Sequence, residues 1–346
     1  MTTLATSETL HVPIDHHSAV QTAADRAREL AQVCGMPGAL PDQAAVLASE
    51  LASNISKHAR NGAVFLQQSP LGRRSPLDTA LDTGLDIVAV DNGPGIADIA
   101  LSLTDGYSTT KTMGAGLGAV RRIASDFTLR SAAGRGTSVH ARLAGPGGAK
   151  PRADIGALCL PAAGERTSGD GYAVVADDTS LTGLVVDGLG HGPDAAAVSL
   201  RAMRTFLACA DAPLPEIIEA LHSALRHTRG AAASLVRVGA GHAEFCGVGN
   251  IRAAVLSSYG VARQLTGQPG IVGYNLPVPR VQHLDVSGHT GLVLCTDGID
   301  HRWARDPDPA QLNLPPVLLA ASLAHTYRLR RDDATVLALG SPLGIG

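Results

Sequence analysis

The sequence predicts an α+β protein of two domains, and three observations support this. Its 346 residues exceed what one hydrophobic core comfortably holds. A stretch between Leu143 and Ile155 is too rich in glycine and proline to form a helix or strand. Helical and strand-like patterns mix before this stretch, whereas strand-like runs outnumber helices after it. We therefore predict domains at residues 1–144 and 153–346, with a linker at 145–152.

The first domain combines helices with a small sheet. A short strand region is expected at the N-terminus, before helices at residues 19–33, 41–59 and 118–125. Apolar and β-branched runs predict strands at residues 85–90, 126–131 and 137–143.

The second domain is predicted to contain β-sheets flanked by helices. Strand-like runs occur at residues 172–176, 181–186, 232–238, 243–248, 253–257, 291–295 and 334–339. Helices are predicted at 193–208 and 214–229, the latter with one apolar stripe. A segment rich in proline and aspartate at 305–316 is expected to be a loop.

Composition excludes several classes of protein. The net charge of −3 and the 17 % of charged residues leave no basic field for a nucleic-acid backbone. Five widely spaced cysteines in apolar runs indicate reduced thiols instead of disulfides or a zinc site. Because the sequence has neither a signal-peptide pattern nor a membrane-length apolar run, we expect a soluble cytoplasmic protein without a membrane partner.

One helix of the first domain carries two polar side chains on the same face. Glu50 and Asn54 are one helical turn apart, whereas Leu47, Leu51 and Ile55 form a separate apolar stripe. Taken alone, this pattern is more typical of a solvated helix face.

Glycine-rich loops elsewhere in this domain favour a nucleotide site. The run at 85–90 ends in Asp-Asn-Gly-Pro-Gly at 91–95, with more glycine than an ordinary turn needs. Gly114, Gly116 and Gly118 stand at the start of a predicted helix, where backbone N–H groups can bind phosphates. Neither the dinucleotide fingerprint nor the P-loop pattern is present.

Together with Gly134-Arg-Gly-Thr137, these motifs resemble the GHKL (Bergerat-type) ATP-binding fold, and within it the RsbT-like serine/threonine kinases of partner-switching systems. The resemblance covers about residues 10–143 and implies an α/β sandwich that binds ATP and Mg²⁺. It implies that Asp91 accepts from the adenine amino group, Asn54 binds Mg²⁺ and Glu50 is the general base. The other nucleotide contacts would come from Gly93, Gly95, Lys111, Gly114, Gly116, Gly118 and Thr137. His58 is interpreted as a pocket-edge or packing residue.

Four acidic residues of the second domain lie at the ends of strand-like runs. Asp187 and Asp297 follow such runs, whereas Asp170 and Asp332 precede them. One Asp-Gly pair is usually a turn, but four placed in this way can meet at one edge of a sheet. Carboxylate oxygens bind hard divalent cations, and an aspartate at the end of a buried strand is costly unless a positive charge neutralises it. The pattern predicts a metal cluster.

The order Ser-Gly-Asp170, Val-Asp187-Gly-x-Gly-His-Gly, Thr-Asp297-Gly and Asp332-Asp333-x-Thr-Val resembles the SpoIIE/RsbX/RsbU branch of the metal-dependent serine/threonine phosphatases, the PPM family. The resemblance spans about residues 153–340. It implies a PPM-type β-sandwich with helices on both outer faces (α-β-β-α) and hydrolysis without a phosphoenzyme, supported by two Mn²⁺ or Mg²⁺ ions.

The resemblance also implies a ligand set for the two ions. Asp187 would bridge them and be catalytic, Asp170 and the Gly188 carbonyl would serve one, and Asp297 with Asp332 the other. Asp333 is the second choice to Asp332. His191 is either a proton donor or a loop residue, and Asp177 and Asp178 are interpreted as a hairpin turn. The motifs place no arginine to hold the substrate phosphate.

Three functions fit these patterns. The first is a bifunctional regulator that phosphorylates and dephosphorylates a STAS-type partner, such as an anti-anti-sigma or stressosome-like protein. The second is a phosphatase that is gated by nucleotide binding. The third is a non-catalytic module that sequesters an anti-anti-sigma or sigma-like partner. A homodimer is left open.

Overall fold

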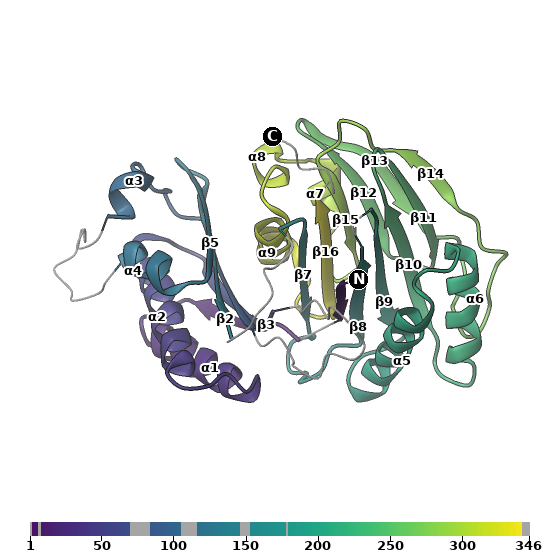
Figure 1. Ribbon diagram of the computed structural model, residues 1–346, viewed down its shortest axis with the longest axis horizontal. Coiled ribbons are helices and arrows are strands. Elements are labelled where there is room, and N and C mark those ends of the chain that lie inside the picture. The colour runs from purple at the N-terminus through teal and green to yellow at the C-terminus, as the bar shows by residue number, and fades with distance from the viewer. Residues whose placement is uncertain are drawn as a thin grey trace. The chain divides into compact units, whose positions relative to one another are not determined.

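The computed structural model describes residues 2–5, 8–69, 84–104, 116–145, 153–177 and 179–340. The described residues form two compact units (Figure 1). The N-terminal unit holds those of Thr9–Leu71 and Ala80–Lys150, and the C-terminal unit holds those of Met1–Glu8 and Pro151–Gly346.

The N-terminal unit is built on a five-stranded antiparallel sheet of order β2-β3-β4-β6-β5. Its strands are β2 (Leu10–Ile14), β3 (Gly62–Gln68), β4 (Gly84–Asp91), β5 (Asp126–Ala132) and β6 (Gly136–Ala144). Its helices are α1 (Ser18–Val33), α2 (Leu40–His58), α3 (Ile99–Ser102) and α4 (Gly116–Ile123). The core lies between one sheet face and the helices, where Leu47 and Leu51 of α2 pack with Val64, Ile87 and Val139 of the sheet.

The C-terminal unit contains two antiparallel sheets, of order β1-β8-β9-β10-β11-β14 and β13-β12-β15-β16-β7. The first consists of β1 (Thr2–Ala5), β8 (Asp170–Ala176), β9 (Leu181–Gly188), β10 (Ala231–Val238), β11 (His242–Val248) and β14 (Gln282–Asp285). The second consists of β7 (Ile155–Leu160), β12 (Arg252–Ser257), β13 (Gly260–Thr266), β15 (Gly291–Cys295) and β16 (Ala334–Gly340). Side chains from both sheets share one core, which includes Tyr172, Phe245, Leu294 and Leu337.

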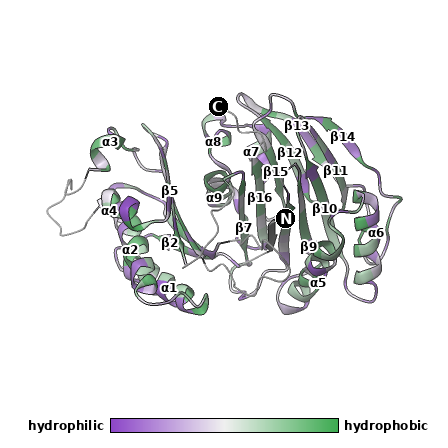
Figure 2. Ribbon diagram, in the orientation of Figure 1, coloured by the Kyte–Doolittle hydropathy of each residue, from purple (hydrophilic) through white to green (hydrophobic). Residues whose placement is uncertain are grey.

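Helices cover the outer face of each sheet, so the unit has four layers. Helices α5 (Pro193–Cys209) and α6 (Leu214–Leu225) pack on the six-stranded sheet, with Phe206 and Ile218 fully buried. Helix α9 (Pro316–Tyr327) packs on β7 and β16, and α7 (Arg302–Arg305) and α8 (Pro309–Leu312) lie nearby. Figure 2 shows hydrophobic residues along the strands of both sheets. The mixed α/β class with antiparallel sheets and the predicted α-β-β-α arrangement are confirmed.

The structure adds elements that the sequence patterns did not predict. Strand β1 pairs with β8 of the C-terminal unit, from Thr2↔Ala176 to Ala5↔Ala173, whereas the expected boundary put it in the first domain. Helix α9 was missed because it is apolar on almost every side, which hides the helical period. Strand β14 is a short polar edge strand, and β3, β7, β13 and α3 were also missed. The predicted loop at 305–316 contains α8.

Helix α6 ends at Leu225, earlier than predicted, because the next residues leave the helical conformation. Arg226 has an extended ψ of 142°, and His227 has a φ of +65°. Among the described residues, no helix is long and apolar enough to cross a membrane.

Candidate functional sites

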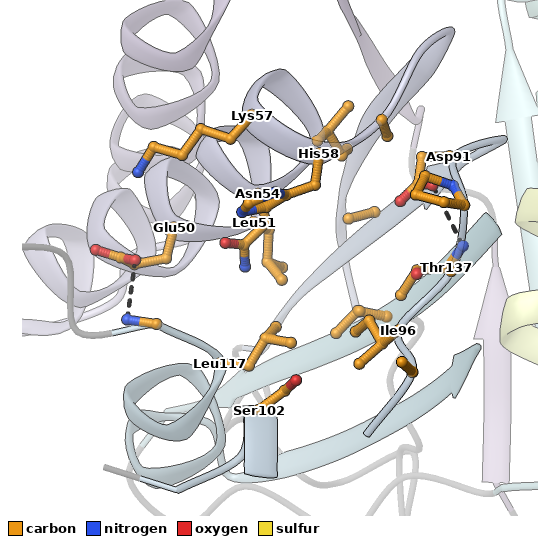
Figure 3. A pocket seen from close by; sticks show the side chains of 18 of the residues that line it. Glu50, Leu51, Asn54, Lys57, His58, Asp91, Ile96, Ser102, Leu117 and Thr137 are labelled. Atoms are coloured by element: carbon orange, nitrogen blue, oxygen red, sulfur yellow. Dashed lines mark hydrogen bonds between the residues drawn. The ribbon is translucent and has the colours of Figure 1, made fainter. Parts of the chain in front are cut away.

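A cavity of about 390 Å³ in the N-terminal unit brings together most of the predicted nucleotide residues (Figure 3). Helix α2 contributes Glu50 and Asn54 to the wall of the cavity. The end of β4 and the loop after it form a second part of the wall, and α4 and β6 complete it. The predicted residues that line it are Glu50, Asn54, Asp91, Gly95, Gly116 and Thr137. Lys57, Asp98 and Ser102 also line it and were not predicted.

Asp91 stands at the end of β4 and is held by backbone donors. Its Oδ1 accepts from the Gly93 N–H at 2.7 Å and from the Thr137 N–H at 3.3 Å. Thr137 is its direct partner in the β4–β6 register. The carboxylate is therefore fixed at the rim before any ligand arrives.

Two glycines keep this rim open. Gly136 has a φ of +82°, and a Cβ there would lie 1.9 Å from the Asp91 carbonyl oxygen. Gly95 has a φ of +78°, and its Cβ would lie 2.2 Å from the Ala132 carbonyl oxygen. Only glycine fits both the positive φ and the close approach.

Glu50 and Asn54 of α2 line the same cavity, as their spacing of one helical turn predicted (Figure 3). Glu50 Oε2 accepts from the Gly116 N–H at 3.2 Å, which joins α2 to the start of α4. The Asn54 Nδ2 atom is buried and has no hydrogen-bond partner within the described parts of the chain. A buried amide without a partner fits a polar ligand at this position.

The remaining predicted residues of this site lie in different places. A Cβ on Gly93 would lie 2.8 Å from the Ala59 Cβ, so this glycine lets the loop pass close to α2. Gly118 is buried within α4 and is not part of the cavity wall. His58 lines the cavity, as a pocket-edge residue would. Lys111 and Gly114 lie outside the described residues.

In the C-terminal unit, the β8–β9 register places the first two acids opposite each other, since Asp170 pairs directly with Asp187. Asp170 is 4 % exposed, and its Oδ2 accepts from the Thr296 hydroxyl at 2.7 Å. Burial, and then the charge of Asp187, raise the pKa of Asp170 well above its ordinary value.

Asp187 lies near three other acids. Burial and the charges of Asp297, Asp332 and Asp333 raise its pKa to about 7. The pKa of Asp297 is also raised, by burial and then by Asp332, although Asn250 Nδ2 donates to Asp297 Oδ2 at 2.7 Å. Asp297 and Asp332 therefore come within electrostatic range of Asp187 despite their distance along the chain.

The neighbouring acids Asp332 and Asp333 have different surroundings. Asp333 is 3 % exposed, and its two oxygens accept from the N–H groups of Ala162 and Gly169 at 2.7 and 2.8 Å. Asp332 is exposed, and its Oδ1 accepts from the Asp333 N–H at 3.0 Å. Asp333 thus ties three backbone segments together, whereas Asp332 faces solvent.

The acid cluster, defined as Asp170, Asp187, Asp297 and Asp332, has the chemistry of a hard-cation site. Among the described residues, no three His, Cys, Asp or Glu side chains already stand in ligating positions. Burial and the three neighbouring acids nevertheless raise the pKa of Asp187, so negative charge accumulates around this carboxyl. Oxygen donors with excess negative charge fit Mg²⁺ or Mn²⁺.

Other predicted residues of this unit take supporting places. The His191 ring contacts Glu165, with 2.8 Å between Nδ1 and Oε1, and its side chain is largely exposed. Asp177 accepts from Thr179 and Ser180 in the turn between β8 and β9, which lowers its pKa to about 2. Asp178 lies outside the described residues. Thr296 and Asn250 were not given roles, although Thr296 stands within the Thr-Asp297-Gly motif that the resemblance uses.

Comparison with known proteins relates the C-terminal unit to one family. Residues 177–341 match the family model described as Stage II sporulation protein E (SpoIIE). The matched stretch lies within the C-terminal unit and includes Asp187, Asp297 and Asp332.

Two curated relatives from Bacillus subtilis (strain 168) match separate stretches of the chain. Over 94 residues the chain is 42 % identical to serine/threonine-protein kinase RsbT, and this alignment covers 27 % of the chain and 64 % of RsbT. Over 115 residues the chain is 31 % identical to phosphoserine phosphatase RsbX, and this alignment covers 31 % of the chain and 58 % of RsbX. The chain therefore spans about three fifths of the length of each relative.

A crystal structure of RsbX in complex with magnesium is also similar. It shares 25 % sequence identity, with 56 % of this chain and 98 % of that chain covered, at a TM-score of 0.47.

Proposed function

We propose that this protein is a bifunctional partner-switching regulator. The C-terminal unit acts as a Mn²⁺- or Mg²⁺-dependent phosphoserine/phosphothreonine phosphatase, and the N-terminal unit as a GHKL-type, ATP-dependent serine/threonine kinase. Both act on a STAS-domain partner. The observation that supports this proposal most strongly is the acid cluster, in which burial and then the charges of neighbouring acids raise the pKa of Asp187 to about 7. The match of residues 177–341 to the SpoIIE model supports the phosphatase half.

In this proposal the acid cluster holds two divalent ions. Asp187 would hold both ions, Asp170 and the Gly188 carbonyl would hold one, and Asp297 with Asp332 would hold the other. When bound, the ions supply positive charge for the phosphate and lower the pKa of water.

The chain's own residues orient the acids. Thr296 donates to Asp170, Asn250 donates to Asp297, and the two backbone bonds of Asp333 hold the segments beside the cluster. Because Asp333 already accepts two hydrogen bonds, we rank it below Asp332 as a ligand.

The kinase half is supported by the cavity and by the RsbT match. Asp91 would accept from the adenine amino group, and Asn54 would serve the Mg²⁺ that accompanies ATP. Glu50 would take the proton of the substrate hydroxyl, and the Gly116 N–H already orients its carboxylate.

The phosphatase is tested with the purified full chain, Mn²⁺ and a phosphorylated STAS-domain protein. We expect phosphate release that EDTA abolishes and that Asp187→Asn lowers by about a thousandfold or more. Asp177→Asn removes the same charge in an exposed turn and serves as the control, with wild-type activity. Hydrolysis by Asp187→Asn at the wild-type rate would refute the assignment.

The kinase is tested with γ-labelled ATP and the unphosphorylated partner. We expect transfer of label to serine or threonine, and Glu50→Gln should lose transfer while still binding ATP. If ATP alters only the dephosphorylation rate and no label is transferred, the gating alternative replaces the kinase. A stable complex with the partner, without phosphorylation or dephosphorylation, would favour the non-catalytic binding module instead.

A further inference from the structure

We propose that a cationic pocket beside the loop at 188–190, lined by Arg201, His227 and Arg229, binds acidic residues flanking the phosphorylated serine or threonine of the protein substrate. The inference rests on the proposed phosphatase function and deepens it, because it assigns a specificity subsite to that activity.

The pocket is a cavity of about 490 Å³ between α5 and the segment that follows α6. Its walls are formed by Asp194, Ala197, Val198, Arg201, His227, Thr228 and Arg229. These residues all belong to the C-terminal unit, and Val198 of α5 packs in the core on the outer face of its six-stranded sheet.

The pocket adjoins the loop that follows Asp187. The Leu189 N–H donates to the Gly230 carbonyl at 3.1 Å, and Gly188 pairs with Ala231 in the β9–β10 register. A Cβ on Gly190 would lie 3.1 Å from an Arg229 guanidinium nitrogen. Arg229 therefore lies beside the loop that follows Asp187, within reach of a peptide whose phosphate is bound at the acid cluster.

The charges of the pocket favour an anionic group. Two arginines face one acid, Asp194, whose Oδ2 lies 2.7 Å from Arg229 Nη2. The side chains of this pair are 74 % and 54 % exposed, so the pair is weak and screened by water. A substrate carboxylate can replace Asp194 at low cost and bind the planar guanidinium through two hydrogen bonds.

The backbone holds Arg229 in a defined place. His227 has a backbone φ of +65°, a conformation that residues other than glycine rarely adopt. Backbone strain of this kind is concentrated at functional segments of proteins. The Thr228 hydroxyl donates to the Leu225 carbonyl at 2.6 Å and accepts from the Gly230 N–H at 3.1 Å. Thr228 thus fastens the turn that carries Arg229 to the end of α6.

The first test compares three substrates: a phosphoserine peptide flanked by Asp and Glu, the same peptide flanked by Asn and Gln, and p-nitrophenyl phosphate. For Arg229→Gln we expect KM for the acidic peptide to rise about tenfold while kcat stays within about twofold. The other two substrates should be unaffected. Arg226→Gln removes the same charge from an exposed residue three positions away, outside the pocket wall, and should change nothing.

A variant of opposite sign sharpens this test. Asp194→Asn removes the carboxylate that competes for Arg229, so KM for the acidic peptide should fall severalfold. An equal loss on all three substrates in Arg229→Gln would overturn the proposal, because Arg229 would then act on the reacting phosphate or on folding.

The second test measures binding without turnover, so that failure of the phosphatase assignment can be told apart. The anisotropy of a labelled acidic phosphopeptide is followed in EDTA with the full chain. We expect binding that weakens with salt and that Arg229→Gln reduces about tenfold relative to Arg226→Gln. Equal affinity for the acidic and neutral peptides would overturn the subsite, even if hydrolysis is confirmed.

Discussion

The two candidate sites treat their acids in opposite ways. In the N-terminal unit, Asp91 and Glu50 accept hydrogen bonds from backbone N–H groups at the rim of a formed cavity. In the C-terminal unit, the pKa values of Asp170, Asp187 and Asp297 are all raised, first by burial and then by the charges of neighbouring acids. Backbone donors thus hold the acids of the first site, whereas burial and neighbouring acids disfavour the charged form at the second.

The difference reflects the ligand that each site would take. A nucleotide brings its own hydrogen-bonding groups, so an acceptor such as Asp91 can be held in place by backbone donors before the nucleotide binds. A divalent cation needs several oxygens around one point, and such oxygens repel one another until the cation binds. In the ligand-free protein, repulsion between carboxylates is thus expected in the C-terminal unit and not in the N-terminal unit.

The largest expected effect is a separation of the two activities by single substitutions. Asp187→Asn should lower hydrolysis of p-nitrophenyl phosphate by about a thousandfold and leave ATP binding unchanged. Asp91→Asn should weaken ATP binding by about a hundredfold and leave that hydrolysis unchanged, because it loses an oriented acceptor. Loss of both properties in either variant would contradict two independent sites.

A pair of glycines tests how rigid the rim of the N-terminal cavity is. Gly136→Ala should destabilise the protein by about 3 kcal/mol or more, since its Cβ would lie 1.9 Å from the Asp91 carbonyl oxygen at a φ of +82°. Gly134→Ala has a φ of +71° with nothing within 4 Å, and should cost only about 1 kcal/mol. Denaturant unfolding measures both, and equal costs would show that the rim yields.

The pH dependence of stability should reveal the strained cluster. Folding raises the pKa of Asp187 from 3.8 to about 7, so between these values the folded state binds more protons than the unfolded state. The free energy of unfolding of the metal-free protein should therefore fall as pH rises through this window, by up to about 1.4 kcal/mol per unit for this group. Asp187→Asn should flatten the slope, and an unchanged slope would mean that Asp187 is not strained.

Cation binding should relieve the same repulsion. Mn²⁺ in excess is expected to raise the Tm of the wild-type protein by a few degrees, because it binds only the folded cluster. Asp187→Asn should show a much smaller rise, whereas Asp91→Asn should respond like the wild type. Thermal denaturation with and without Mn²⁺ measures this, and equal shifts in all three proteins would place the cation elsewhere.

The smallest effect is expected at an acid that its surroundings already satisfy. Asp177 accepts from Thr179 and Ser180, which lowers its pKa to about 2, the opposite direction to Asp187. Asp177→Asn should therefore destabilise the protein slightly, within about 1 kcal/mol for an exposed turn. Because the pKa is lowered, this contribution should be lost as pH falls below 3.8. A gain in stability would show that Asp177 is strained as well.

Local patterns predicted much of the fold and of the candidate sites. Strand β4, which ends at Asp91, and strand β9, which carries Asp187 next to its last residue Gly188, are short apolar runs, and α2 shows its apolar stripe in the sequence. Helix α9 could not be recognised in this way, because burial on almost every side removes the periodicity that marks a helix.

By itself, the sequence determined which residue types stand at strand ends and loops, and so the two motif sets and most of the elements. Only the tertiary structure decided that β1 joins the sheet of the C-terminal unit, that Asp333 is bound by two backbone N–H groups while Asp332 faces solvent, and that Arg229 lies beside the loop after Asp187. The physical reason is range. Strand and helix patterns are set by neighbours along the chain, whereas burial, repulsion between acids and the place of an arginine depend on segments that meet only in the folded protein.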